Sequence, residues 1–217
     1  MRVVVLVSGR GSNLEALIAA QQRGELPIRI VGVMSDKRKA RALQVARDSN
    51  IDAIHLDPNG FKDRASYDLA LFANIAGLNP DLIVLAGFMR ILDPLAFAPW
   101  LGRIINIHPS LLPLYPGLHT HRRVLEAGDS RHGASVHFVT SELDGGPVIA
   151  QTLIDITSDD TEETLAFRLL AGEHELLKSC IDLISRGRVA WSDGEVIFDG
   201  KSLQAPLQFE GGIRAAG

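Results

Sequence analysis

The sequence predicts an α/β fold: a doubly wound, mainly parallel, Rossmann-like sheet with an antiparallel C-terminal portion. Short apolar runs rich in β-branched residues recur along the first half of the chain. They lack polar alternation, as expected for parallel strands that helices cover on both faces. Segments of helical periodicity separate these runs, which is the pattern of right-handed β-α-β crossovers. In the second half, two longer strand patterns follow one another across a short loop, which favours an antiparallel pair.

Each element of the first half follows from its own local pattern. Residues 8–12 form a turn with two glycines, and Asn13 is expected to cap the first helix. The apolar residues that follow, at 14, 17 and 18, share one face of that helix. We expect helices over residues 40–49 and 67–75, and strands over residues 3–7, 28–34, 53–56, 82–85 and 103–107.

The second half contains the antiparallel portion and one long helix. The loop 140–147 joins predicted strands over 134–139 and 148–156. Thr161, with Thr164, is expected to cap a helix over 161–186. A hairpin around Gly194 pairs 191–193 with 196–198. We expect one domain over 1–217, with halves 1–100 and 101–210 and a flexible tail over 211–217.

Composition narrows the possible partners of the chain. Its 217 residues carry a formal net charge of −4, so they lack the basic surface typical of nucleic-acid binding. No apolar stretch approaches the roughly 20 residues of a membrane helix, so no membrane association is expected. Cys180 is the only cysteine, which fits a reducing compartment and predicts a cytoplasmic protein.

The glycine turn predicts an anion site. Its backbone N–H groups precede a helix N-terminus, so Gly11, Ser12 and Asn13 can bind a monophosphate. A dinucleotide fingerprint needs a third glycine where Leu14 stands. Asp36 could still take the part of the ribose-binding acid, so the dinucleotide alternative stays open, as does a tight turn that binds nothing.

Asn106 and His108 point to acyl chemistry. They alternate along the strand over 103–107 and its exit, at the sheet edge where open α/β folds bind ligands. An amide and an imidazole there can stabilise an oxyanion, and the imidazole can move protons. A carboxylate such as Asp144 near His108 would raise the histidine pKa. For His108 considered alone, satisfaction of a local hydrogen bond is the favoured explanation.

The other candidate groups carry weaker signals. His119 and His121, with His132 or His137, have spacings that could suggest zinc, but no compact ligand set completes the site, so we predict no metal. His137 alternates in a strand and could line the same cleft as His108. Ser110 lacks the context of a nucleophilic serine.

Several segments together resemble the folate-dependent formyltransferases, specifically those that act on glycinamide ribonucleotide. These are VLVSGRGSNL at 5–14, LAGFMRIL at 85–92, NIHPSLLP at 106–113 with YPG at 115–117, GASVHFV at 133–139 and DGGP at 144–147. The resemblance covers about residues 3–174.

The resemblance implies the reaction and a role for each matching residue. The formyl group of 10-formyltetrahydrofolate, the cosubstrate, would pass to the amine of 5-phosphoribosylglycinamide in purine biosynthesis. Asn106, His108 and Asp144 would be catalytic. The ribonucleotide would bind Gly11, Ser12, Asn13 and Glu173. The folate would bind Arg64, Met89, Arg90, Ile91, Leu92, Thr140, Ser141, Glu142 and Leu143.

Alternatives remain within and outside this family. A formyl-folate hydrolase or a methionyl-tRNA formyltransferase would carry a further domain, for which we expect no room. A nucleotide-binding oxidoreductase is weakened by the missing third glycine, and a silent binding module by the catalytic trio. A different phosphorylated amine as acceptor is not excluded. We expect small-molecule substrates and a monomer or homodimer.

Overall fold

The computed structural model describes residues 1–210 and 213–214 and divides into two compact units, Met1–Asn106 and Ile107–Gly217. Strand β5 (Ile104–His108) runs through the boundary between them. Each unit has its own core and its own candidate residues. The expectation of a single domain remains a prediction.

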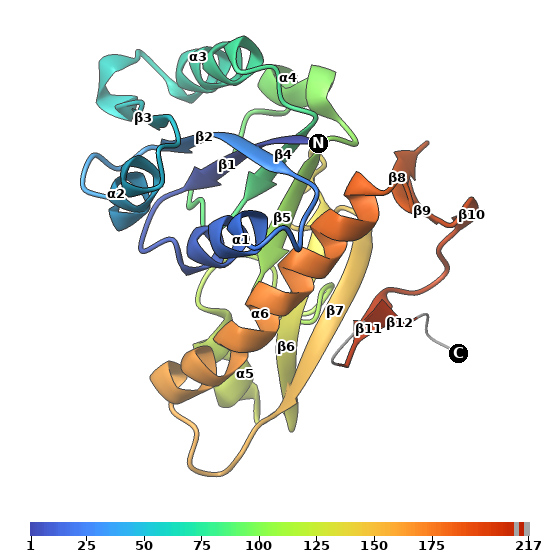
Figure 1. Ribbon diagram of the computed structural model, residues 1–217. Helices are drawn as coiled ribbons and strands as arrows, with labels where there is room; N and C mark the ends of the chain where they lie inside the picture. Colours follow the sequence, from blue (N-terminus) through green and yellow to red (C-terminus); the bar gives the residue numbers. More distant parts are fainter. Residues whose placement is uncertain (211–212, 215–217) are drawn as a thin grey trace. The chain divides into compact units, whose positions relative to one another are not determined.

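Unit 1 is built on parallel strands in the order β5-β4-β1-β2-β3. Besides β5 these are β1 (Arg2–Val7), β2 (Arg29–Ser35), β3 (Ala53–His55) and β4 (Leu82–Leu85). The chain starts in the middle, winds outward to β3, and then crosses to β4 (Figure 1). This reversal of strand order between β1 and β4 is the switch point at which open α/β sheets bind ligands. Val3–Val7 of β1 have no exposed surface, which explains their continuous apolar run.

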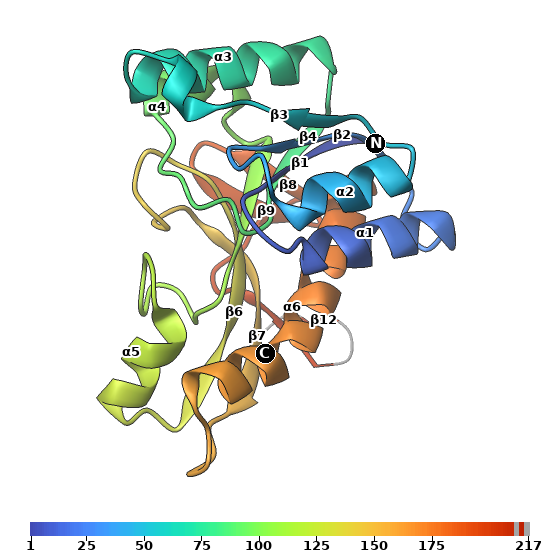
Figure 2. The same ribbon diagram turned by 90° about the vertical axis from the view of Figure 1, so that its left-hand side faces the viewer.

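Helices cover both faces of this sheet. Helices α1 (Ser12–Gln22) and α2 (Arg41–Asp48) lie on one face, and α3 (Arg64–Gly77) and α4 (Pro94–Phe97) on the other (Figure 2). Short 3-10 turns occupy Pro58–Gly60 and Ala98–Trp100. Helix α3 begins with a capping box between Asp63 and Ser66.

The expected cap of the first helix is wrong. Gly11, not Asn13, is the N-cap of α1, and no side chain caps it. Gly11 has φ +84°, and a Cβ there would lie 2.6 Å from the Cβ of Ala42 in α2. Glycine is therefore required both by the left-handed conformation and by the close approach of α2.

Unit 2 contains the antiparallel pair β6 (Arg131–Phe138) and β7 (Val148–Asp155). Strand β11 (Leu207–Phe209) pairs parallel with β7 and antiparallel with β12 (Ile213–Arg214). A separate small sheet joins β8 (Val189–Ser192), β9 (Glu195–Phe198) and β10 (Lys201–Ser202). Helix α5 (Thr120–Ala127) precedes β6, and the long α6 (Glu162–Ser185) packs on β6 and β7.

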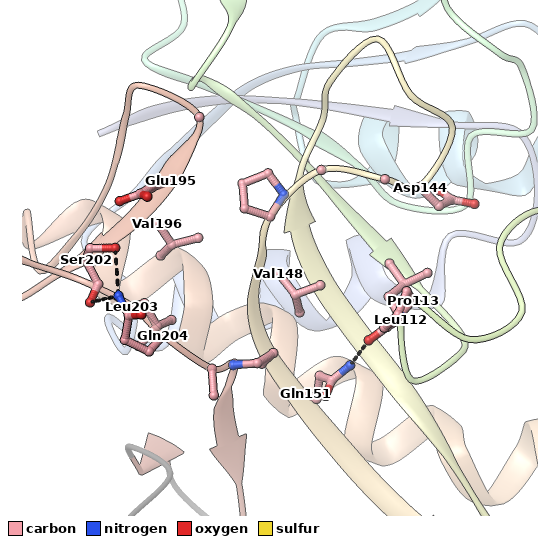
Figure 3. Close-up of a pocket in the computed structure, with 16 residues that line it drawn as sticks. Leu112, Pro113, Asp144, Val148, Gln151, Glu195, Val196, Ser202, Leu203 and Gln204 are labelled. Atoms are coloured by element: carbon pink, nitrogen blue, oxygen red, sulfur yellow. Dashed lines mark hydrogen bonds between the residues drawn. The ribbon is translucent and has the colours of Figure 1, made fainter.

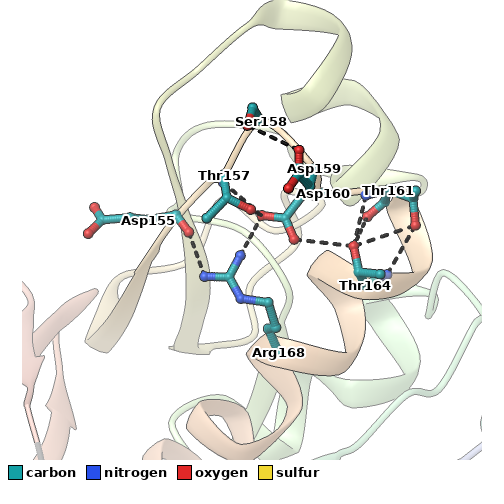
Figure 4. A network of polar contacts seen from close by, with 8 residues as sticks. All are labelled: Asp155, Thr157, Ser158, Asp159, Asp160, Thr161, Thr164 and Arg168. Atoms are coloured by element: carbon teal, nitrogen blue, oxygen red, sulfur yellow. Dashed lines mark hydrogen bonds and ion pairs between the residues drawn. The ribbon is translucent and has the colours of Figure 1, made fainter.

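A polar network shapes the turn between β7 and α6 (Figure 4). The carboxylate of Asp160 accepts hydrogen bonds from the N–H of Thr157 at 2.8 Å and from the hydroxyl of Thr164 at 3.2 Å, and it pairs with Arg168. Thr161 and Thr164 form the capping box of α6, so the expected cap of this helix is confirmed. These contacts lower the pKa of Asp160 to about 2, the Thr157 backbone N–H having the largest effect.

The predicted α/β class, mainly parallel with an antiparallel C-terminal portion, is confirmed. The expected strands are present within a few residues, but β6 starts earlier than predicted, at Arg131, and α3 begins before 67. Helices α4 and α5 and strands β10, β11 and β12 were not predicted. Of the predicted tail over 211–217, residues 213–214 form β12 and the others lie outside the described residues. Among the described residues, no helix is long and apolar enough to cross a membrane.

Candidate active site

Strand β5 and its exit loop position His108. Alternation along β5 puts Asn106, which is half-buried, and His108, which is 6% exposed, on one side of the strand. The Nε2–H of His108 donates to the carbonyl of Tyr115 at 3.0 Å, because a carbonyl can only accept. This bond leaves Nδ1 of His108 facing the Asp144 carboxylate, 3.5 Å from Oδ2.

Asp144 lies between two histidines of unit 2. Its Oδ1 is 3.6 Å from Nε2 of His137, and its Oδ2 accepts a hydrogen bond from the N–H of Gly117 at 2.8 Å. The other nitrogen of His137, Nδ1, donates to the carbonyl of Phe138 at 2.9 Å. The Asp144 side chain is 9% exposed, so one buried carboxylate faces two imidazoles.

Burial and nearby charges have opposite effects on the pKa of His108. Burial lowers the pKa of His108 and outweighs the Tyr115 carbonyl and the Asp144 carboxylate, which both raise it. Asp144 therefore acts in the expected direction, but the net shift of the His108 pKa is downward because burial has the larger effect. Burial alone would raise the pKa of Asp144, but the His137 contact, the Gly117 N–H and the positive potential of both histidines bring it below its usual value.

The loop after β5 is held by buried hydroxyl groups. The Ser135 hydroxyl donates to the carbonyl of Ser110 at 2.6 Å and accepts from the N–H of Leu112 at 3.0 Å. Gln151 donates to the same hydroxyl and to the carbonyl of Leu112, each at 2.9 Å. The hydroxyl of Ser110 donates to the carbonyl of Leu114 at 2.6 Å, so it serves the loop rather than a nucleophilic role.

The loop 140–147 requires its glycines. A Cβ on Gly146 would lie 1.8 Å from the carbonyl oxygen of Phe138, so only glycine fits. Asp144 itself has φ +51°. Ser141, Glu142 and Leu143 are exposed and Thr140 is half-buried, so this loop offers its side chains and backbone to solvent. Leu143 is 51% exposed.

A cavity of about 490 Å³ adjoins this loop within unit 2 (Figure 3). The residues that line it include Leu112, Asp144, Gly146, Gln151, Glu195 and Gln204. The Gln151 amide points toward Leu112 and is committed to the hydrogen bond with that carbonyl. The 144–146 stretch thus borders open space on this side.

In unit 1, the predicted phosphate residues lie together at the start of α1. Gly11 is the N-cap, and Ser12 and Asn13 are the first helical residues. Backbone N–H groups of a first turn lack acceptors within the helix and attract anions. Asn13 is 8% exposed. Glu173, the fourth predicted ribonucleotide residue, lies half-buried on α6 of unit 2.

The predicted folate segment of unit 1 follows β4. Met89 and Ile91 are 63% and 55% exposed, whereas Leu92 is buried. The guanidinium of Arg90 lies over the ring of Tyr67, 4.5 Å from the centroid. Arg64, the first residue of α3, is exposed.

His137, which was not in the predicted catalytic set, also lies beside Asp144. Its alternation in β6 placed it near His108 in the sequence analysis, and the structure places both next to Asp144. His121 and His132 contact each other instead, with Nδ1 of His121 2.9 Å from Nε2 of His132. Within the described part of the chain, no three His, Cys, Asp or Glu residues are grouped so that they could hold a metal ion.

The chain is similar to known proteins over almost its whole length. A family model described as formyl transferase matches residues 1–181. The phosphoribosylglycinamide formyltransferase of Escherichia coli (strain K12) is 45% identical over 201 residues, which are 90% of this chain and 95% of that protein. The corresponding protein of Haemophilus influenzae is 39% identical over 203 residues, 93% of this chain and 95% of its own length.

Solved structures agree with the sequence relatives. The phosphoribosylglycinamide formyltransferase of Coxiella burnetii has a TM-score of 0.91 and 43% identity, covering 97% of this chain and 99% of that one. The glycinamide ribonucleotide transformylase 1 of Symbiobacterium toebii has a TM-score of 0.88 and 39% identity, covering 91% and 93%. The chain therefore belongs to the formyl transferase family, among its phosphoribosylglycinamide formyltransferases.

Proposed function

We propose that this chain transfers the formyl group of 10-formyltetrahydrofolate to the amine of 5-phosphoribosylglycinamide, in purine biosynthesis. The observation that carries the proposal is the buried contact of 3.5 Å between His108 and Asp144. Both residues lie in segments that resemble the family signature, and the chain is an enzyme of that family. The products are formylglycinamide ribonucleotide and tetrahydrofolate.

The reaction forms one carbon–nitrogen bond and breaks another. The free amine attacks the formyl carbon, and the carbonyl oxygen takes the negative charge of a tetrahedral intermediate. Asn106 and His108 donate hydrogen bonds to this oxygen, and for this His108 turns its Nε2–H from the Tyr115 carbonyl to the oxyanion while Nδ1 stays beside Asp144. The bond from the formyl carbon to N10 of the folate then breaks, and a proton lost by the amine is delivered to N10 through His108 or a water that Asp144 orients.

The charge of His108 changes during this cycle. In the free protein, burial favours the neutral imidazole. An oxyanion that develops beside the ring favours the imidazolium, and the Asp144 carboxylate supports the same form. His108 thus becomes a strong donor as the negative charge forms, which stabilises the transition state more than the ground state.

The resemblance divides the predicted binding residues into a set for the ribonucleotide and a set for the folate. We assign the ribonucleotide phosphate to the first turn of α1, with Glu173 as a further substrate residue. Exposed Met89 and Ile91 offer contact surface to the folate ring, and the arginines at 64 and 90 suit its carboxylates. We assign further folate contacts to the exposed loop at 140–143.

The single buried Cys180, whose thiol pKa burial raises, fits the reducing cytoplasm in which we place the enzyme.

The decisive test is a formyl-transfer assay with and without glycinamide ribonucleotide. We expect amine-dependent release of tetrahydrofolate, and a loss of about 10²–10³ in kcat for His108→Ala. His55→Ala, a half-buried histidine on β3, is the matched control and should keep near-native turnover. Near-native turnover of His108→Ala would remove the assigned role.

Other outcomes of the same assay identify other functions. Folate release without the amine would indicate a hydrolase. Absence of release with glycinamide ribonucleotide would indicate a different acceptor or a binding protein. Light scattering on the same sample decides between a monomer and a homodimer.

A further inference from the structure

In the segment from Met89 to Asp93 of unit 1, the central backbone N–H groups lack acceptors in the described part of the chain, whereas those at both ends are hydrogen-bonded. Among the described residues, none accepts a hydrogen bond from the backbone N–H groups of Arg90, Ile91 or Leu92. The N–H groups at the two ends, those of Met89 and Asp93, are both bonded to side chains from elsewhere in the unit. Three backbone donors without an acceptor in the described chain thus lie between two bonded positions.

Ser8 fixes the first end. Its hydroxyl accepts from the N–H of Met89 at 2.9 Å, and its backbone N–H donates to the carbonyl of Gly87 at 2.9 Å. The same hydroxyl donates to Oδ1 of Asp36 at 2.6 Å. A hydroxyl has one proton, so donation to Asp36 turns its lone pairs toward Met89. Asp36 is only 4% exposed, and Lys37 lies 3.5 Å from its other oxygen.

Asp68 fixes the second end. Its Oδ2 accepts from the N–H of Asp93 at 2.7 Å, and the residue has no exposed surface. Asp93 in turn starts α4, because its side chain accepts from the N–H of Leu95 at 2.9 Å. The other oxygen of Asp68 is buried without a hydrogen-bond partner among the described residues. A carboxylate in that state is unfavourable for stability, and such costs are typical of functional positions.

We propose that Ser8, oriented by Asp36, and Asp68 are positioning residues that hold the two ends of the folate-binding segment 89–92. The inference rests on the folate role proposed above for that segment. Neither group needs to touch the folate. They act through the N–H groups of Met89 and Asp93, whose positions set where the free donors between them point. Because Ser8 also precedes the glycine turn, its backbone joins the folate segment to the proposed phosphate turn.

The test measures binding rather than turnover, in the full chain. The probes are a non-reactive dideaza analogue of folate and, separately, glycinamide ribonucleotide, each by titration calorimetry. We expect Ser8→Ala and Asp68→Leu each to weaken analogue binding about tenfold, the size of one hydrogen bond. Ribonucleotide binding should change less than twofold. Ser8→Thr keeps the hydroxyl and should restore analogue binding.

The control is Ser192→Ala, another serine whose hydroxyl donates to an aspartate, Asp193, on an exposed hairpin of unit 2. It should bind both probes as the native chain does. Analogue binding within twofold of native for Ser8→Ala overturns the inference, even if Asp68→Leu fails to fold. A native chain that does not bind the analogue overturns the folate role itself, so the two failures are distinguishable.

Discussion

Asp144 is the residue on which the candidate site is centred, because it faces His108 and His137 from one carboxylate. Its negative charge opposes the effect of burial on the His108 imidazole. Removing that charge while keeping the shape of the side chain therefore separates electrostatics from geometry. The amide of asparagine can still accept from the N–H of Gly117, so the loop keeps this contact.

We predict that Asp144→Asn lowers the pKa of His108 further below its usual value. The sign follows from linkage between the charges: a carboxylate at 3.5 Å favours the imidazolium, and its neutral replacement does not. In the dependence of kcat on pH, the acidic limb that reflects titration of His108 should move to lower pH. The kcat at pH 7 should fall at least tenfold. NMR titration of the His108 ring measures the shift. Asp155→Asn, whose side chain is 86% exposed, is the control and should leave this pKa unchanged.

At the scale of single elements, the start of α6 depends on one side chain. The hydroxyl of Thr161 accepts from the N–H of Thr164 at 3.3 Å and closes the capping box. We predict that Thr161→Ala lowers the free energy of unfolding by about 1 kcal/mol, the usual effect of losing a threonine cap. Urea denaturation followed by circular dichroism measures it. Thr140→Ala, which removes a threonine from a loop and no helix cap, is the matched control; an equal loss there would show that capping is not the cause.

The element scale also shows what the sequence could and could not predict. The buried strands β1 and β4 were evident because their residues are apolar on both faces. Helix α5 was missed because it has only eight residues and because His119 precedes it in a left-handed conformation. Asn13 looked like a cap, but the close packing of Ala42 on Gly11 determines where α1 starts. That contact joins residues far apart in the sequence, so local pattern could not reveal it.

The same division holds for the candidate site. The sequence predicted a catalytic role for Asn106, His108 and Asp144. Strand alternation and the family resemblance can both be recognised in local sequence. The net pKa of His108 could not be predicted, because it depends on how deeply the ring is buried and on the Tyr115 carbonyl. His137 was expected near the cleft but was not included in the catalytic set. Its contact with Asp144, which joins residues of a strand and a loop, is visible only in the structure.

At the scale of the whole molecule, strand β5 gives residues to both units, because Ile104–Asn106 belong to the first and Ile107–His108 to the second. Ile104, Ile105 and Ile107 are all buried, so neither unit can release its part of β5 without exposing apolar surface. This continuity favours one folding unit over two independent domains.

We therefore predict that both units unfold in a single transition. Each contains one tryptophan: Trp100 lies under the guanidinium of Arg103, and Trp191 packs edge-on against Phe138. The variants Trp191→Phe and Trp100→Phe leave one fluorescent reporter in unit 1 and unit 2, respectively. In urea, the fluorescence midpoint of each variant should coincide with the midpoint from its own circular dichroism, the test of two-state behaviour. A fluorescence midpoint well separated from the dichroism midpoint in either variant would show that the units unfold independently, and the single-domain prediction would then be wrong.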